Sequence, residues 1–141
     1  MAGRSRMTRD GGVALRVVAA IAVVFGLLTI VSGGNALFGG AEARARMGQV
    51  VPFVLVFNFV AGFAYVVAGL GLWFRKYWAA WLAAAIFAGS LVVLLLLGLH
   101  ALQGGGYEMR TVLAMLLRCA VWAMVATVAL WALARRAKPN A

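Results

Sequence analysis

The sequence predicts an all-α integral membrane protein, a four-helix up-down-up-down bundle formed by one domain over residues 1–141. Two observations support this prediction. The chain is 66% hydrophobic and carries only thirteen Lys or Arg and three Asp or Glu residues, whereas a soluble domain is nearer half apolar and a quarter charged. Its apolar residues also gather in four long stretches separated by short polar segments. Such a chain cannot bury its apolar surface in its own core and needs a lipid bilayer around it.

The four apolar stretches cover about residues 13–38, 50–74, 77–102 and 111–133. Each exceeds the roughly 20 residues that cross a ~30 Å hydrocarbon layer as a helix. Helices are expected because a segment in lipid must satisfy its own backbone hydrogen bonds, and no stretch shows the alternation of a barrel strand. The connecting segments are short, so we expect no extramembrane domain.

Arginine and lysine residues predict the orientation. Arg44, Arg46 and Arg110 follow the first or third stretch and lie on one side of the membrane, and Arg118 lies inside the fourth stretch. The other nine basic residues lie at the ends of the stretches that face the opposite side. Those nine are Arg4, Arg6, Arg9, Arg16, Arg75, Lys76, Arg135, Arg136 and Lys138. The positive-inside rule then places both termini in the cytoplasm, in a bacterial-type inner membrane that the chain crosses several times. The net charge of +10 suits anionic lipid headgroups, so we expect the lipid bilayer and no nucleic acid as partner. A cleaved secretory signal is the alternative for the first stretch, although its apolar run is long for one.

One short phrase occurs twice in the chain. Asn35-Ala-Leu-Phe-Gly-Gly and His100-Ala-Leu-Gln-Gly-Gly each precede a Glu-x-Arg segment, at Glu42 and at Glu108. Duplication would make the bundle a two-plus-two repeat with parallel halves. The alternative is local, because glycines often end helices and a carboxylate is favoured just before the next helix.

Arg118 is the one charged residue well inside an apolar stretch. It lies about nine residues, or ~13 Å, from the outer end of the fourth helix, where a charge costs about 2.5–3.5 kcal/mol on insertion scales. Asn58 lies at a matching depth in the second helix. We predict a polar pocket open to the outer face, whose cation favours an anionic or carbonyl-bearing ligand. The predicted binding residues are Arg118 and Asn58 at its floor and His100, Glu108, Glu42 and Asn35 at its rim. The alternative is that Arg118 ties the helices together by bonding a glutamate, Asn58 or a backbone carbonyl.

Few residues suit redox, metal or hydrolytic chemistry. Cys119 is the only cysteine and His100 the only histidine, which excludes thiol-pair exchange, a bis-histidine haem within one chain and a zinc site of ordinary spacing. A copper site formed by His100 with Met109 and Met115 is the weaker alternative. Phosphate-binding loops, serine nucleophile elbows and paired catalytic carboxylates are absent from the sequence. We therefore expect no cofactor, no metal and no catalytic residue, which favours a protein without enzymatic activity but leaves that question open.

The stretch Ala61–Ala84 joins a glycine-rich helix, the basic turn Arg75-Lys76 and the start of the next helix. It resembles the second and third helices of the DoxX-like family of four-helix bacterial membrane proteins. Some members of that family are linked to quinone-coupled oxidation, so the resemblance implies a redox membrane subunit, but it carries over no site residue. In this chain Arg118 or His100 would be the carbonyl partner of a bound quinone. From the residues themselves we expect a noncatalytic accessory subunit or interaction module of a membrane complex, bound to another membrane protein or to copies of itself. The alternative is a transporter, or a quinone- or anion-binding bundle that takes a small molecule from the outer face.

Overall fold

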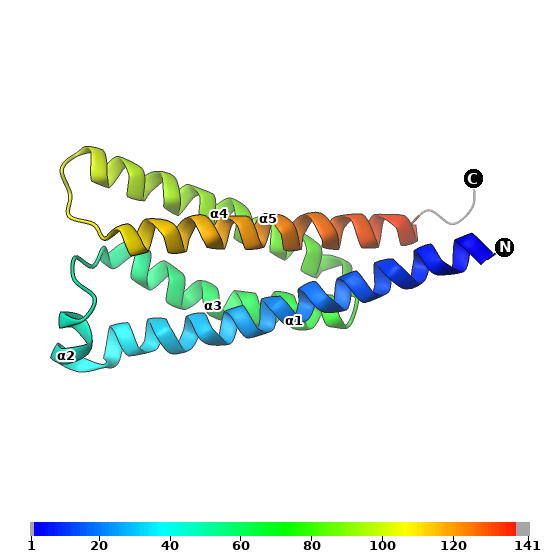
Figure 1. Ribbon diagram of the computed structural model, residues 1–141, viewed down its shortest axis with the longest axis horizontal. Coiled ribbons are helices and arrows are strands. Elements are labelled where there is room, and N and C mark those ends of the chain that lie inside the picture. The colour runs from blue at the N-terminus through cyan, green and yellow to red at the C-terminus, as the bar shows by residue number, and fades with distance from the viewer. Residues whose placement is uncertain (1, 138–141) are drawn as a thin grey trace.

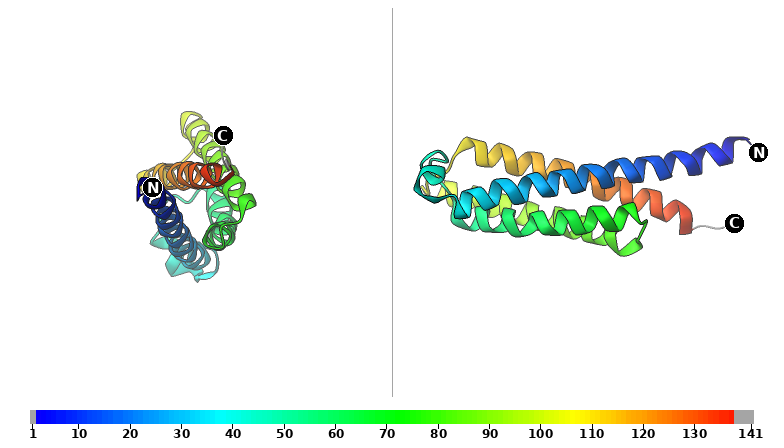
Figure 2. Two further views of the ribbon diagram at one scale, coloured as in Figure 1. Left: turned by 90° about the vertical axis from the view of Figure 1, so that its right-hand side faces the viewer. Right: turned by 90° about the horizontal axis from the view of Figure 1, so that it is seen from below.

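The computed structural model describes residues 2–137, which form helices, turns and loops but no strand. The helices, in chain order, are α1 (Ala2–Phe38), α2 (Gly40–Ala45), α3 (Pro52–Trp73), α4 (Tyr77–Leu102) and α5 (Met109–Ala137). The four long helices lie along one axis and cross at small angles (Figure 1). The first and last described residues lie at the same end of the bundle, as the further views confirm (Figure 2). The predicted all-helical class is confirmed.

Four segments of the described chain are long and apolar enough to cross a membrane: Gly11–Phe38, Pro52–Trp73, Tyr77–Leu102 and Met109–Arg135. Each overlaps one of the predicted spans almost completely. Large apolar side chains on their outer surfaces are exposed, which in a protein of this kind is the surface that lipid covers. The protein is therefore a multi-pass membrane protein.

The two ends of the bundle are built differently. One end carries the described termini and the tight turn between α3 and α4, where Arg75 has a φ of 58°. In that turn the N–H of Lys76 donates to the carbonyl oxygen of Gly71 at 2.8 Å. The other end carries the two longer connections, residues 39–51 with α2 and residues 103–108 (Figure 1). We call the first the terminal end and the second the two-loop end.

Glycines let α1 and α3 approach closely. A Cβ atom added at Gly62 of α3 would lie 2.8 Å from Cγ1 of Ile30 and 3.2 Å from the carbonyl oxygen of Gly26 on α1. One added at Gly69 would lie 2.9 Å from the carbonyl oxygen of Ala19. Small residues at such a contact allow two backbones to pack directly in a membrane. As a result, α1 packs more extensively against α3 than against any other helix.

The buried core is continuous at the terminal end and incomplete at the two-loop end. Toward the terminal end, residues of all four long helices pack together, among them Leu15, Tyr65, Ala83 and Trp122. Toward the two-loop end a smaller cluster joins α3, α4 and α5 only, and no residue of α1 belongs to it. The cluster consists of Val51, Val54, Val93, Leu97 and Met115. In this half of the bundle, therefore, no buried apolar cluster of the described residues joins α1 to α5.

The two-plus-two repeat stays a prediction. Of the two glycines that the repeat would make equivalent, Gly33 is covered by Phe59, whose Cβ would lie 3.1 Å from an added Cβ atom. An added Cβ at Gly98 would have no heavy atom within 4 Å. The first connection also contains α2, whereas the second has no helix.

Candidate functional site

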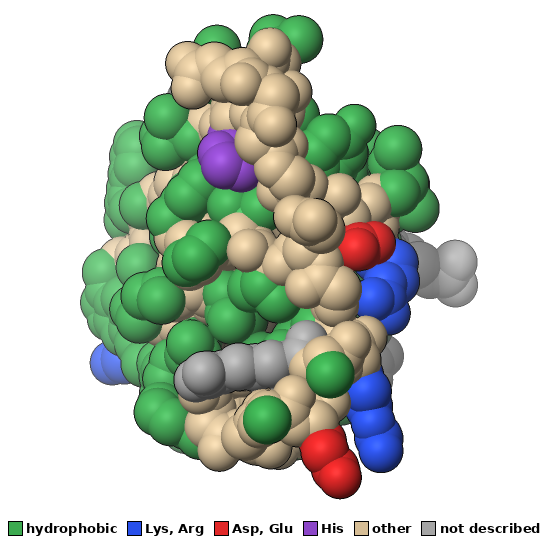
Figure 3. Space-filling view, turned by 90° about the vertical axis from the view of Figure 1, so that its left-hand side faces the viewer, with side chains coloured by type: hydrophobic (Ala, Val, Ile, Leu, Met, Phe, Trp, Pro, Cys, Tyr) green, Lys and Arg blue, Asp and Glu red, His purple; other side chains and the backbone are tan. Residues whose placement is uncertain are grey.

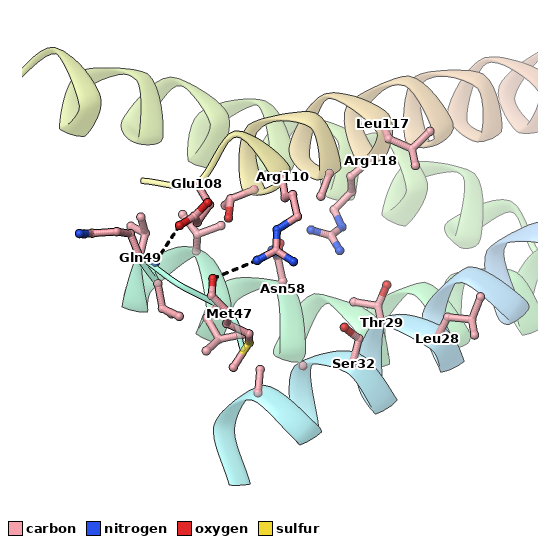
Figure 4. Close-up of a pocket in the computed structure, with 18 of the residues that line it drawn as sticks. Leu28, Thr29, Ser32, Met47, Gln49, Asn58, Glu108, Arg110, Leu117 and Arg118 are labelled. Carbon is pink, nitrogen blue, oxygen red and sulfur yellow. Dashed lines mark hydrogen bonds between the residues drawn. The ribbon is translucent and has the colours of Figure 1, made fainter. Parts of the chain in front are cut away.

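A cavity of about 420 Å³ lies between α1, α3 and α5 at the two-loop end (Figure 4). It lies where no buried apolar cluster in the described chain joins α1 to α5. Its volume lies in the range of small-molecule sites, roughly 300–1,000 Å³. Its lining comes from α1, from residues 47–51, from α3 and from the start of α5. Among the described residues, none from α4 lines it.

Arg118 lies at the inner part of this cavity and is only 7% exposed. Its guanidinium points into the cavity from α5 (Figure 4). The carbon Cζ lies 5.8 Å from the ring centroid of Phe25 and 5.9 Å from that of Tyr65, within cation–π range. A hydrogen bond runs from Nη1 to the sulfur of Met115 at 3.4 Å, and Nε is buried without a hydrogen-bond partner. The cation therefore has aromatic neighbours but no counter-ion within the described chain.

The alternative role of Arg118, as a tie between helices, lacks its expected partners. Glu108 instead accepts a hydrogen bond from the backbone N–H of Gln49 to Oε1, at 3.1 Å. The Oδ1 atom of Asn58 is buried and has no hydrogen-bond partner in the described structure. No hydrogen bond joins Arg118 to a backbone carbonyl of the described residues. The geometry therefore favours a cation that is left available to the cavity.

Other polar side chains converge on the same space. Thr29 and Ser32 of α1 point toward it from the side opposite Arg118, and Asn58 reaches it from α3 (Figure 4). Thr29 is buried although its helix surface is otherwise largely apolar. A ligand at Arg118 would thus meet the guanidinium of that residue, two hydroxyl groups and one amide.

The mouth of the cavity is held by hydrogen bonds between its two connections. Arg110 at the start of α5 donates from Nη2 to the carbonyl oxygens of Arg46 and Met47, each at 3.4 Å. The bond between Gln49 and Glu108 adds a second link. These contacts fix the segment that follows α2 against the first turn of α5.

Three of the predicted binding residues line the cavity: Arg118, Asn58 and Glu108. The structure does not bring the other three to it. His100 lies on α4, where its Nε2 is 3.3 Å from the carbonyl oxygen of Gly106 and its ring meets Phe53 edge-on. Glu42 and Asn35 are exposed, on α2 and on the last turns of α1. Seen from the two-loop end, the histidine is set apart from the charged side chains (Figure 3).

The predicted binding residues did not include Gln49, Arg110 or Phe25. Phe25 carries no signal of its own, because it is one of many apolar residues in the first span. Arg110 follows Glu108 in the repeated Glu-x-Arg segment, which the sequence already placed at the outer end of the bundle. Gln49 acts through its backbone N–H, which no side-chain pattern reveals.

In the described part of the chain, no three His, Cys, Asp or Glu residues lie close enough together to hold a metal ion. Comparison of the chain with protein-family models, with curated protein sequences and with solved structures gives no match. The assignment of function therefore depends on the geometry of the cavity around Arg118.

Proposed function

We propose that this protein is a membrane-embedded binding protein whose cavity at the two-loop end takes a small anionic ligand. The observation that supports the proposal is Arg118, which is 7% exposed, points into the cavity and has no carboxylate partner among the described residues. An uncompensated charge in an apolar interior is costly. A bound anion offsets that cost, because a guanidinium forms short charge-assisted hydrogen bonds to carboxylates and phosphates.

A quinone is a weaker fit to the same cavity. The DoxX-like resemblance of Ala61–Ala84 suggests a carbonyl ligand at Arg118, and a carbonyl oxygen would accept a hydrogen bond from it. A neutral ligand, however, leaves the positive charge of the guanidinium uncompensated. We therefore favour an anion over a quinone as the ligand.

An accessory subunit of a membrane complex is the second candidate. The same uncompensated cation supports it, because a carboxylate on a partner's transmembrane helix would complete the site. The exposed apolar side chains beside the cavity, Leu28 and Leu117, suit contact with such a helix. In this case the partner, and not a small molecule, would occupy the space between α1 and α5.

The distribution of arginine and lysine supports an orientation for the site. The basic residues of the α3–α4 turn and of the terminal segments favour the cytoplasmic side for the terminal end. The two-loop end, and with it the cavity, would then face the outside of a bacterial-type inner membrane. Blocking an introduced cysteine at Gln103 in sealed cells with a membrane-impermeant thiol reagent tests this orientation.

The binding proposal is tested with the purified protein in neutral detergent. Butyrate is expected to raise the melting temperature in a concentration-dependent way, because a ligand that binds only the folded state stabilises it. Butylammonium, of equal length and opposite charge, should give no shift. The Arg118→Leu variant should lose the butyrate shift, and Arg46→Leu, which removes an exposed arginine at the same end, should keep it. An equal shift in Arg118→Leu and the native protein would reject the anion site.

Native mass spectrometry of the protein released from its own membrane separates the two candidates. A small-molecule mass bound to the chain supports the binding protein. A larger protein held at fixed stoichiometry, and released by Arg118→Leu, supports the accessory subunit.

A further inference from the structure

Two exposed residues of the cavity lining indicate a lateral opening between α1 and α5. Leu28 on α1 and Leu117 on α5 both line the cavity, yet they are 64% and 58% exposed. Each is the chain neighbour of a polar lining residue, Thr29 and Arg118 respectively. The opening between the two leucines therefore lies at the depth of Arg118.

The surface around this lateral opening faces lipid. Both leucines lie within helices that are long and apolar enough to span the membrane. The buried cluster at this end contains no residue of α1, so no core contact closes the gap between α1 and α5. A chain that leaves the cavity between Leu28 and Leu117 would enter the hydrocarbon layer directly.

The polar and apolar parts of the cavity are arranged for a molecule with two ends. Hydroxyl, amide and guanidinium groups of Thr29, Ser32, Asn58 and Arg118 meet inside (Figure 4), and the lining also contains the apolar side chains of Phe25, Leu28 and Leu117. A headgroup at Arg118 would lie about nine residues, or ~13 Å, below the start of α5. Arg118 therefore lies at the depth of the hydrocarbon layer. Any part of the ligand that extends out of the cavity at this depth would lie among lipid chains.

Charge and size narrow the ligand further. The described charged residues that line the cavity are Arg110, Arg118 and Glu108, which leaves one net positive charge for the ligand to balance. The cavity volume of about 420 Å³ lies near the lower end of the range for small-molecule sites, roughly 300–1,000 Å³. That space holds a carboxylate and the first part of one alkyl chain, and it is too small for the headgroup and both chains of a phospholipid.

Resting on the proposed anion site, we infer that the ligand is a single-chain amphiphile with a carboxylate headgroup. Its carboxylate pairs with Arg118, and its alkyl chain passes between Leu28 and Leu117 into the bilayer. The planar guanidinium matches the two oxygens of a carboxylate.

The test uses the full chain in phosphatidylcholine nanodiscs and palmitic acid that carries a diazirine in its alkyl chain. On illumination we expect crosslinks concentrated on Phe25, Leu28 and Leu117, located by peptide mass spectrometry. An alkylammonium of the same length with the same diazirine should not show this concentration. Arg118→Leu, or Arg118→Gln if the leucine variant folds poorly, should lower the yield at these residues about tenfold or more, as expected when a charge-assisted hydrogen bond is lost.

A second pair of variants tests the lateral path. Leu28→Trp should narrow the opening and reduce crosslinking by the palmitic acid probe, while the butyrate shift in melting temperature remains. Leu95→Trp places the same side chain on the exposed surface of α4 and should change neither result. Crosslinks spread evenly over lipid-facing residues and unaffected at Arg118 would overturn the amphiphile inference. If butyrate still binds in that case, the anion site stands, and if butyrate also fails, both proposals fall.

Discussion

Replacing Arg118 with leucine is expected to stabilise the folded bundle while it abolishes ligand binding. Most substitutions of a buried residue destabilise a protein. The sign of the change in the free energy of unfolding therefore separates a binding residue, whose loss stabilises the bundle, from a structural one. The expectation follows from the surroundings of Arg118, whose Nε has no hydrogen-bond partner and whose Nη1 donates to a methionine sulfur. Its removal thus leaves no carboxylate or carbonyl of the described residues unpaired.

The magnitude can be worked from the contacts of the guanidinium. Near mid-membrane an arginine costs about 2.5–3.5 kcal/mol, and a leucine is favourable by about 0.3–0.6 kcal/mol. The substitution also loses two cation–π contacts, to Phe25 and Tyr65, at 5.8 and 5.9 Å. At about 0.5–1 kcal/mol each, these offset one-third to one-half of the gain. We expect a net stabilisation of about 1–3 kcal/mol.

Equilibrium unfolding in mixed micelles, followed by circular dichroism as the fraction of SDS rises, measures this change. Arg46→Leu serves as the control for removal of an exposed arginine and should stay within about 0.5 kcal/mol of the native protein. A loss of about 1 kcal/mol or more in Arg118→Leu, or a failure to insert and fold, would refute the reasoning. The arginine would then be a structural tie, and the binding proposal would lose its main support.

Three further predictions concern the packing and the connections. Gly62→Ala should lower the free energy of unfolding by about 1–3 kcal/mol, because the added methyl group meets α1. Gly98→Ala, whose added methyl group meets nothing, should raise it by about 0.5–1 kcal/mol in the same unfolding assay. Equal effects of the two substitutions would contradict the close α1–α3 contact. Glu108→Ala should speed hydrogen exchange at the amide of Gln49 by about tenfold, since that N–H loses a charged acceptor, and unchanged exchange would show that the bond is not formed. Arg75→Gly should stabilise the turn by about 1 kcal/mol, because the position has a φ of 58°, and a destabilised variant would show that its side chain matters more than its backbone.

The sequence was sufficient for the helices and for Arg118, and the physical reasons are general ones. A bilayer admits few alternatives to a long apolar helix, so length and composition predict the spans. An isolated charge inside such a span is expensive, so the position of Arg118 in the sequence alone indicates a specific role for it. Asn58 followed from its matching depth in the second span.

The sequence was not sufficient for the neighbours of each helix. Helices that are apolar over most of their surface give little indication of which side packs inward, so the pairing of α1 with α3 and the gap between α1 and α5 at the two-loop end could not be predicted. His100 was expected at the rim because it lies at the same end of the bundle, but its helix, α4, does not line the cavity. Asn35 lies six residues beyond Thr29, which turns it to a different side of α1. Two residues at the same end of a bundle need not line the same cavity, whereas residues on one face of one helix usually do.

The glycine contact between α1 and α3 determines which parts of the bundle move as one body. At Gly26, Gly62 and Gly69 backbone meets backbone, so sliding or tilting one helix against the other would bring carbonyl oxygens into collision. The α1–α3 pair therefore presents Thr29, Ser32 and Asn58 to the cavity as one wall, and the spacing of these three polar groups is fixed before any ligand enters. Adjustment to the shape of a ligand falls instead on the side chains of Arg118, Leu28 and Leu117, which do not belong to that contact.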